Sequence, residues 1–150
     1  MNRSAYFDIC GNNNGVYKFA KTLNNASAAV ETALNYGACV PILGVIASVA
    51  TVKFGELQLV LGAATAVTGA IGLGISHLVH SKSHTKKQWN MVTKLGLEHT
   101  IHGALNILSG LGEIVLALST FGLGNLLLII PYHRNDFKPY YRYGQLTFSH

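Results

Sequence analysis

The sequence predicts an all-α protein with an amphipathic N-terminal helix, two helical hairpins and a short aromatic and basic tail, with at least the first hairpin embedded in a membrane. Charged residues make up only 11% of the chain, against about 25% in an average soluble domain. Three long stretches contain no Lys, Arg, Asp or Glu: 32–52, 57–79 and 114–132. The basic residues gather outside these stretches, which is typical of membrane hairpins that keep their cationic segments on one side.

We divide the chain into five segments on this pattern. An N-terminal loop and amphipathic helix occupy 1–36, and a membrane hairpin occupies 37–80. A basic linker follows at 81–97, then a second, amphipathic and apolar hairpin at 98–131. The aromatic and basic tail is 132–150. With both hairpin turns on one side of the membrane, the N-terminus, the linker and the tail share the other side.

The first helix is predicted from a recurrence of apolar residues that places them on one helical face. These residues are Val16, Phe19, Leu23, Ala26, Val30 and Ala33. Such a helix either packs its apolar face on the rest of the fold or lies on the membrane surface. The pattern leaves both interpretations open.

The first hairpin is expected to consist of a helix over 40–52, a short turn at Lys53–Glu56 and a helix from Leu57 to about His80. The second of these helices is apolar all round, which indicates burial in a large core or in lipid. Its small side chains fall in one broad stripe and predict a face that packs closely on helix 40–52. The stripe comprises Gly62, Ala66, Gly69, Ala70 and Gly74. A soluble hairpin, and a hairpin that dips into one leaflet, remain alternatives.

The linker and the tail supply residues that suit the membrane–water interface, where basic and aromatic side chains concentrate. They are Lys82, Lys86, Lys87, Trp89, Arg134, Lys138 and Arg142. The net charge of +5 does not indicate nucleic-acid binding, because the bases flank apolar stretches instead of lining one surface with stacking aromatics. Anionic lipid headgroups suit them better.

The second hairpin is expected to begin with an amphipathic helix near Glu98 that carries a polar stripe. The stripe comprises Glu98, His102, Asn106, Ser109 and Glu113. Three interpretations stay open: a stripe facing water or the interface, the lining of an oligomeric pore, and a metal site. A metal site needs acidic ligands from several helices, and the other helices offer no inward carboxylate, so we expect no metal and no cofactor. No catalytic set is identifiable from spacing, and we expect no enzymatic activity.

Two closely spaced apolar segments joined by a tight turn form a bilobed hydrophobic domain. The stretch Leu34–Val79, with its turn at Lys53–Glu56, resembles the bilobed domain of chlamydial inclusion membrane proteins. The later stretch His102–Leu108, continuing to Gly124–Leu127, is also similar to small membrane-associated proteins of that bacterial group. The resemblance implies type III secretion, insertion into the vacuole membrane around the bacterium, and binding of host proteins by cytosol-facing termini.

The function that these observations favour is that of a non-enzymatic integral membrane protein that modifies the membrane or binds host partners. Its expected partners are membrane lipids, with host proteins or further copies of itself, and no nucleic acid. One alternative is a small oligomeric pore or holin-like channel. Another is a soluble helical module that binds a lipid or an apolar partner.

Overall fold

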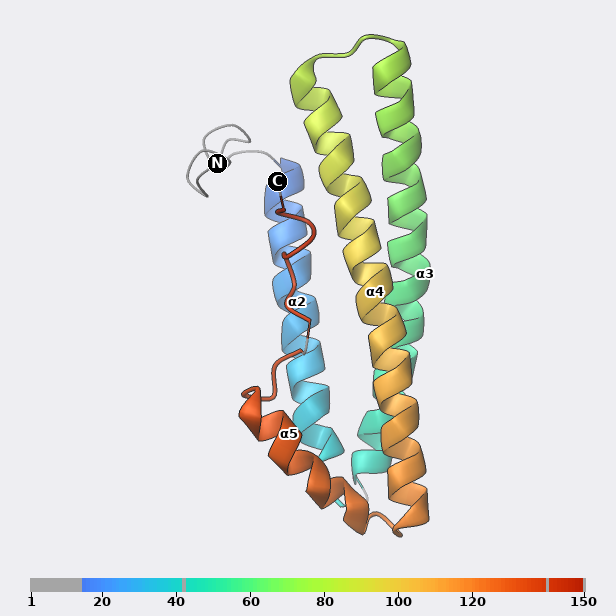
Figure 1. The fold of residues 1–150 in the computed structure, drawn as a ribbon, viewed down its shortest axis with the longest axis vertical. Coiled ribbons are helices and arrows are strands. Elements are labelled where there is room, and N and C mark those ends of the chain that lie inside the picture. The colour runs from blue at the N-terminus through green and yellow to red at the C-terminus, as the bar shows by residue number, and fades with distance from the viewer. Residues whose placement is uncertain (1–14, 42, 140, 150) are drawn as a thin grey trace.

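The computed structural model describes residues 15–41, 43–139 and 141–149 and is all-helical, with no strand among these residues (Figure 1). The expected N-terminal loop lies outside them, and the prediction of an all-α fold is confirmed. The elements are α2 (Gly15–Ala38), α3 (Leu43–Leu78), α4 (Ser83–Ser119), the 3₁₀ helix η1 (Leu123–Leu128) and α5 (Ile129–Arg134). Helices α3 and α4 form a long antiparallel hairpin, with α2 beside it and the tail running back along α2 (Figure 1).

The hairpin does not lie where the sequence placed it. The expected turn at Lys53–Glu56 is helical, and the two expected helices are one helix, α3, of 36 residues. Lys53 and Glu56 form an ion pair of 2.8 Å on its surface, a spacing at which helical side chains meet. The small residue between them, Gly55, faces α4. The charge pair that suggested a loop is therefore compatible with an uninterrupted helix.

The basic linker and the second hairpin also differ from the prediction. Helix α4 begins at Ser83, so most of 81–97 is helical, and it continues to Ser119. The chain then reverses through Gly122, whose φ of 84° is one that glycine adopts without steric cost. The segment after this turn is the short pair η1 and α5, which leads away toward α2 instead of pairing with α4 as a second hairpin (Figure 1).

Small residues bring α3 and α4 into close backbone contact. A Cβ on Gly96 would lie 2.2 Å from the backbone nitrogen of Ala66, and one on Gly103 would lie 2.4 Å from that of Leu59. Gly62 and Gly69 face α4 in the same way. The partner of the predicted small stripe is thus α4. Two stripe members take no part in this contact, because Ala70 and Gly74 are exposed.

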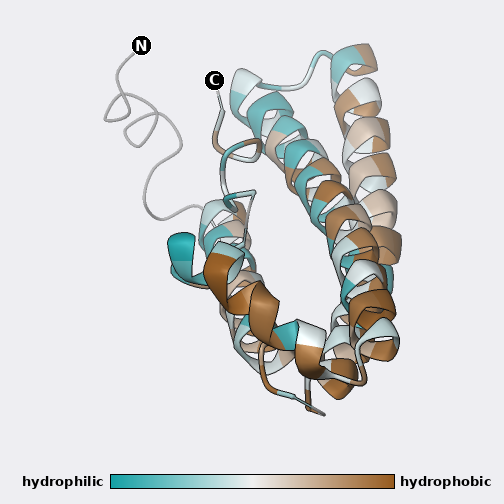
Figure 2. Ribbon diagram, turned by 60° about the horizontal axis from the view of Figure 1, so that its bottom comes forward, coloured by the Kyte–Doolittle hydropathy of each residue, from teal (hydrophilic) through white to brown (hydrophobic). Residues whose placement is uncertain are grey.

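The distribution of polarity is inverted relative to that of a soluble helical bundle. The buried residues of α2 include Asn24, Ser27 and Glu31, while Phe19 and Val30 of the predicted apolar face are 63% and 42% exposed. The buried face of α3 consists of Gly, Ala, Ser, Thr and Gln. Large apolar side chains cover the outside of α3, α4, η1 and α5, and the lower end of the bundle is the most continuously apolar (Figure 2).

Two helices in the described part of the chain are long and apolar enough to cross a membrane, α3 and α4. A core helix of a soluble protein passes the same test, but such a helix is mostly buried. The most apolar windows of α3 and α4 are only 17% and 28% buried. Their apolar surfaces are therefore not used to form the interior of this bundle.

Candidate functional site

Three glutamates occupy the interior and organise its polar side chains. Glu31 of α2 is 3% exposed, and Glu98 and Glu113 of α4 are 0% and 4% exposed. A buried carboxyl group is costly unless it is hydrogen-bonded. Each of these glutamates has its own set of donors, so we describe the interior as three carboxyl clusters.

The central cluster surrounds Glu31. The amide of Asn106 donates to Glu31 Oε1 over 2.7 Å and also contacts Gln58 Oε1 at 2.7 Å. The Tyr143 hydroxyl donates to Glu31 and accepts from the Gln58 amide. His102 Nδ1 lies 3.3 Å from the same carboxyl oxygen. This cluster joins α2, α3, α4 and the tail through one carboxyl group.

The electrostatics of this cluster keep its phenol protonated. Burial, followed by the nearby Glu31 carboxyl group, raises the pKa of the Tyr143 hydroxyl well above its ordinary value of 10.0. A protonated hydroxyl donates a hydrogen bond, which is what Glu31 requires of it. The Tyr143 ring also stacks on the His102 imidazole, with 3.6 Å between ring centroids.

The upper cluster surrounds Glu98 and holds the end of the tail. The backbone N–H groups of Leu146 and Thr147 lie 3.3 Å from its carboxyl oxygens, and the Thr147 hydroxyl donates to Oε2. Asn24 links this cluster to α2, because its amide nitrogen lies 3.5 Å from Glu98 and its oxygen 3.0 Å from His99 Nε2. Glu98 therefore fixes the returning chain against α4.

The lower cluster surrounds Glu113. The hydroxyls of Ser48 and Ser109 donate to its two oxygens over 2.8 Å and 3.1 Å. The Tyr132 hydroxyl donates to Oε1. This cluster joins α3, α4 and α5 at the lower end of the bundle.

The five residues of the predicted polar stripe lie together on one face of α4, and all of them belong to these clusters. The stripe is covered by α2, α5 and the tail of the same chain. Glu98, His102 and Glu113 are buried there, and Asn106 and Ser109 are partly buried, so a pore lined by the whole stripe would require this bundle to open. Among the described residues, no group of three or more His, Cys, Asp or Glu side chains is placed to hold a metal ion.

Several members of the clusters were not anticipated from the sequence. Glu31, Asn24 and Ser27 are not part of the predicted apolar face of the first helix, although their spacing of three and four residues places them on one face of their own. Gln58, Tyr143 and Thr147 come from segments that were expected to lie in lipid or at its surface. Only the fold shows that these side chains meet.

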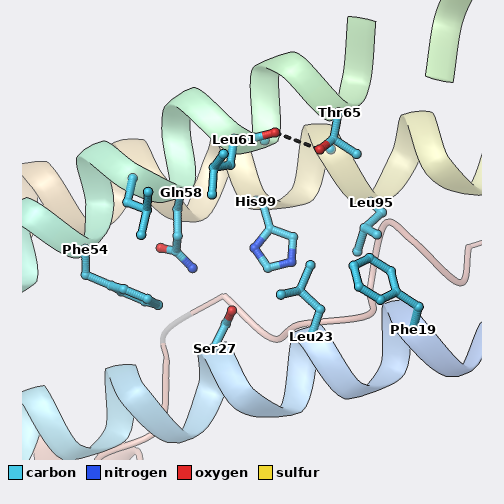
Figure 3. A pocket seen from close by; sticks show the side chains of 12 residues that line it. Phe19, Leu23, Ser27, Phe54, Gln58, Leu61, Thr65, Leu95 and His99 are labelled. Atoms are coloured by element: carbon cyan, nitrogen blue, oxygen red, sulfur yellow. Dashed lines mark hydrogen bonds between the residues drawn. The ribbon is translucent and has the colours of Figure 1, made fainter. Parts of the chain in front are cut away.

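An apolar pocket of about 310 Å³ lies between α2, α3 and α4 (Figure 3). Its walls include Phe19, Leu23, Phe54, Leu61 and Leu95. Four polar side chains, Ser27, Gln58, Thr65 and His99, also line it. Apolar walls with a few polar groups are characteristic of sites for small apolar ligands, and this volume is at the lower limit of such sites.

The expected interface residues lie at two different levels of the bundle. Lys82, Lys86, Lys87 and Trp89 lie at the α3–α4 turn, where the Trp89 ring occupies the space beside Gly72. Arg134 is the last residue of α5 and Lys138 follows that helix, far from the α3–α4 turn (Figure 1). Arg142 lines a broad groove with Asn24 and Asn25 of α2. The tail end does return to the linker, because Lys94 Nζ donates to the Ser149 carbonyl oxygen over 2.7 Å.

The described residues thus form a polar interior and an apolar exterior, with an apolar pocket between α2, α3 and α4. The buried carboxyl groups hold segments of the chain together. No family model, curated protein or solved structure matches this chain.

Proposed function

We propose that this chain is a non-enzymatic membrane protein whose apolar exterior contacts lipid. The observation that supports this proposal is the inversion of polarity, in which Glu31, Glu98 and Glu113 are buried while large apolar side chains of α3 and α4 are exposed. Exposed apolar surface costs about 25 cal/mol per Å² in water. Monomeric soluble proteins seldom leave apolar patches larger than a few hundred Å² uncovered. A lipid environment removes that cost.

The interior agrees with the same proposal. Association of helices in lipid relies on close packing of small residues and on hydrogen bonds between helices, because burial of apolar surface offers no gain there. The Gly62–Gly96 and Gly55–Gly103 contacts supply the close packing. The three carboxyl clusters supply the hydrogen bonds between helices. The bundle is therefore held together by interactions that do not depend on surrounding water.

Carbonate extraction of membranes from cells that express the full chain tests this proposal. We expect the protein to remain in the membrane pellet, and we expect purified protein mixed with phospholipid vesicles to float with them. Release into the carbonate supernatant, together with a monomeric protein that stays soluble without detergent, would contradict the proposal.

The resemblance to chlamydial inclusion membrane proteins supports a finer proposal, in which the protein is a secreted bacterial effector of a vacuole membrane that binds host proteins. The turn at Lys53–Glu56 that contributed to this resemblance is helical, so the hairpin shape is that of α3 and α4. Secretion of a reporter fusion through a type III system, followed by fractionation of infected cells, tests it. A fusion retained in the bacterium contradicts it.

A second candidate function is binding of an apolar ligand such as an acyl chain, and the pocket between α2, α3 and α4 favours it. In Figure 3 the side chains of Leu23, Leu61 and His99 point into this pocket. Leu61→Trp should fill it and abolish binding of a fluorescent fatty-acid probe, while Leu78→Trp at the exposed end of α3 should not. Equal probe binding by both variants contradicts this function.

A further inference from the structure

The apolar pocket between α2, α3 and α4 contains a ring nitrogen that lacks a hydrogen-bond partner. The nitrogen is Nδ1 of His99, whose side chain is 6% exposed. The other ring nitrogen, Nε2, lies 3.0 Å from Asn24 Oδ1. No hydrogen bond joins Nδ1 to any residue that the structure describes. In Figure 3 the ring projects into the pocket and faces Ser27 and Gln58.

The hydrogen bonds around Glu98 place the proton of the His99 ring on Nε2. The Glu98 carboxyl group accepts from the backbone N–H groups of Leu146 and Thr147, and the Asn24 amide nitrogen lies 3.5 Å from it. Because this nitrogen is directed at an acceptor, the Asn24 oxygen faces His99 and accepts from Nε2–H. A neutral imidazole carries only one N–H. Nδ1 is therefore an acceptor.

The pocket favours the neutral form of this ring. Its walls are mostly apolar side chains, among them Leu23, Leu61 and Leu95. An unpaired charge in such surroundings is costly. An imidazolium would also carry a second donor on Nδ1, and no carboxyl group is among the described residues that line the pocket to accept from it.

The other polar side chains of the pocket are already engaged. The Gln58 amide nitrogen donates to the Tyr143 hydroxyl, and its oxygen accepts from α4. The Ser27 hydroxyl also hydrogen-bonds to Tyr143. The Thr65 hydroxyl donates to the Leu61 carbonyl oxygen over 2.7 Å. Each of these side chains thus has a partner within the protein, whereas Nδ1 of the histidine has none.

The pocket opens to the outside of the bundle beside exposed apolar side chains. Phe19 of α2 and Leu57 and Leu61 of α3 line it and are each more than half exposed. In the proposed membrane setting these side chains contact acyl chains, so a lipid can enter from the side without passing through water. The volume of about 310 Å³ is at the lower limit of ligand sites, which favours one chain over a two-chain phospholipid.

We propose that this pocket binds a single-chain lipid with a hydroxyl donor, a long-chain alcohol or a protonated fatty acid, and that the hydroxyl donates to His99 Nδ1. This inference rests on the proposed binding of an apolar ligand and adds the chemistry of its polar end. A carboxylate offers no donor and brings a charge into apolar walls, so it binds more weakly. An ether fills the pocket but leaves the ring nitrogen without a partner.

Competition against the fluorescent fatty-acid probe tests the inference on the full chain in detergent micelles. Decanol and methyl nonyl ether are isomers, and only the alcohol can donate a hydrogen bond. We correct each for its partition into empty micelles. We then expect decanol to bind about threefold to tenfold more tightly, which is the range of one neutral hydrogen bond. Equal affinities of the two isomers for the unmodified protein overturn the inference.

Two variants locate the preference within the pocket. His99→Phe keeps a flat ring and removes the acceptor, so the ratio of alcohol affinity to ether affinity should fall by about threefold to tenfold. Thr65→Val is the matched control, because Thr65 lines the same pocket and its hydroxyl is engaged within α3. The ratio should persist in this control. A ratio that persists in His99→Phe, or is lost in Thr65→Val, overturns the role of His99.

Nitrogen NMR of the unmodified protein measures the hydrogen bond itself. Accepting a hydrogen bond shields an unprotonated ring nitrogen. The Nδ1 signal of His99 should therefore move upfield when decanol binds and stay in place when methyl nonyl ether binds. A signal typical of a protonated Nδ1 in the free protein overturns the assignment of this nitrogen as an acceptor.

The remaining outcomes separate this inference from the proposed ligand binding. If the probe binds Leu61→Trp as well as it binds the unmodified protein, the pocket takes no ligand and both proposals fail. If decanoate in its ionised form displaces the probe better than decanol, the pocket supplies a donor. That result overturns the hydroxyl preference and leaves the binding of an apolar ligand standing.

Discussion

Tyr143 of the tail lies flat against His102 of α4, with 3.6 Å between the ring centroids and 7° between the ring planes. Its hydroxyl donates to Glu31 of α2. One side chain thereby couples the returning tail to two helices. The stability of the bundle should therefore respond to the hydroxyl and to the ring separately.

Tyr143→Phe keeps the stacked ring and removes the donor to the buried Glu31 carboxyl group. We expect a loss of about 1–3 kcal/mol in the free energy of unfolding, because a buried acceptor is left with fewer partners. Tyr143→Leu should cost more, since the stacking on His102 is lost as well. Thermal unfolding in detergent micelles measures both changes. Gln145→Ala, at an exposed tail position, is the control and should change little.

Glu98→Gln should release the end of the tail. The carboxyl group accepts from the backbone of Leu146 and Thr147, and an amide presents a donor where one of these acceptors stood. We expect amide protection over 144–149 to fall by about tenfold, which corresponds to about 1.4 kcal/mol. Hydrogen exchange measures this effect. Glu56→Gln is the control, because the Glu56 side chain is half-exposed on the surface of α3, and it should leave the amides of the tail protected. Equal loss of protection in both variants would contradict the role of Glu98 in holding the tail.

The continuity of α3 can be predicted from the sequence if the period of its small and polar residues is followed instead of its charges. Its buried residues recur every three or four positions through Ser48, Thr51, Gly55, Gln58 and Gly62. This period passes through 53–56 without a change of register, which a turn would not preserve. The charges of Lys53 and Glu56 interrupt an apolar stretch and so suggest a loop, but their spacing also suits an ion pair on a helix surface.

The interior could be predicted only in part. The stripe from Glu98 to Glu113 follows from helical periodicity, because all its members lie on one helix. The side chains that contact this stripe include Glu31, Gln58 and Tyr143, which are far apart in the chain. Of the two interpretations left open for α2, the expectation that its apolar residues pack inside the fold is contradicted, because Asn24, Ser27 and Glu31 are buried while Phe19 and Val30 are exposed. That expectation holds where water surrounds a protein, and lipid removes its physical basis.

A pair of glycine substitutions tests the close contact of α3 and α4. Gly103→Ala places a Cβ 2.4 Å from the Leu59 backbone nitrogen, so the two backbones must separate, and we expect a loss of about 1–3 kcal/mol or more. Gly74→Ala meets nothing within 4 Å and should be neutral or stabilising by up to about 1 kcal/mol. Chemical unfolding of both variants in micelles gives the comparison. Similar stabilities for the two would show that the glycine contact does not hold the hairpin together.

The stability of the bundle should fall in alkaline solution because of Tyr143. Its hydroxyl pKa is raised above 10.0 by burial and by Glu31, so the folded state favours the protonated phenol. The contribution is complete below the ordinary pKa of about 10 and is lost as the pH rises above it. From this group alone we expect a decline of at most about 1.4 kcal/mol per pH unit. Unfolding measured from about pH 9 to about pH 11 should show a shallower decline in Tyr143→Phe than in the unmodified protein, and parallel declines would assign the effect to other groups.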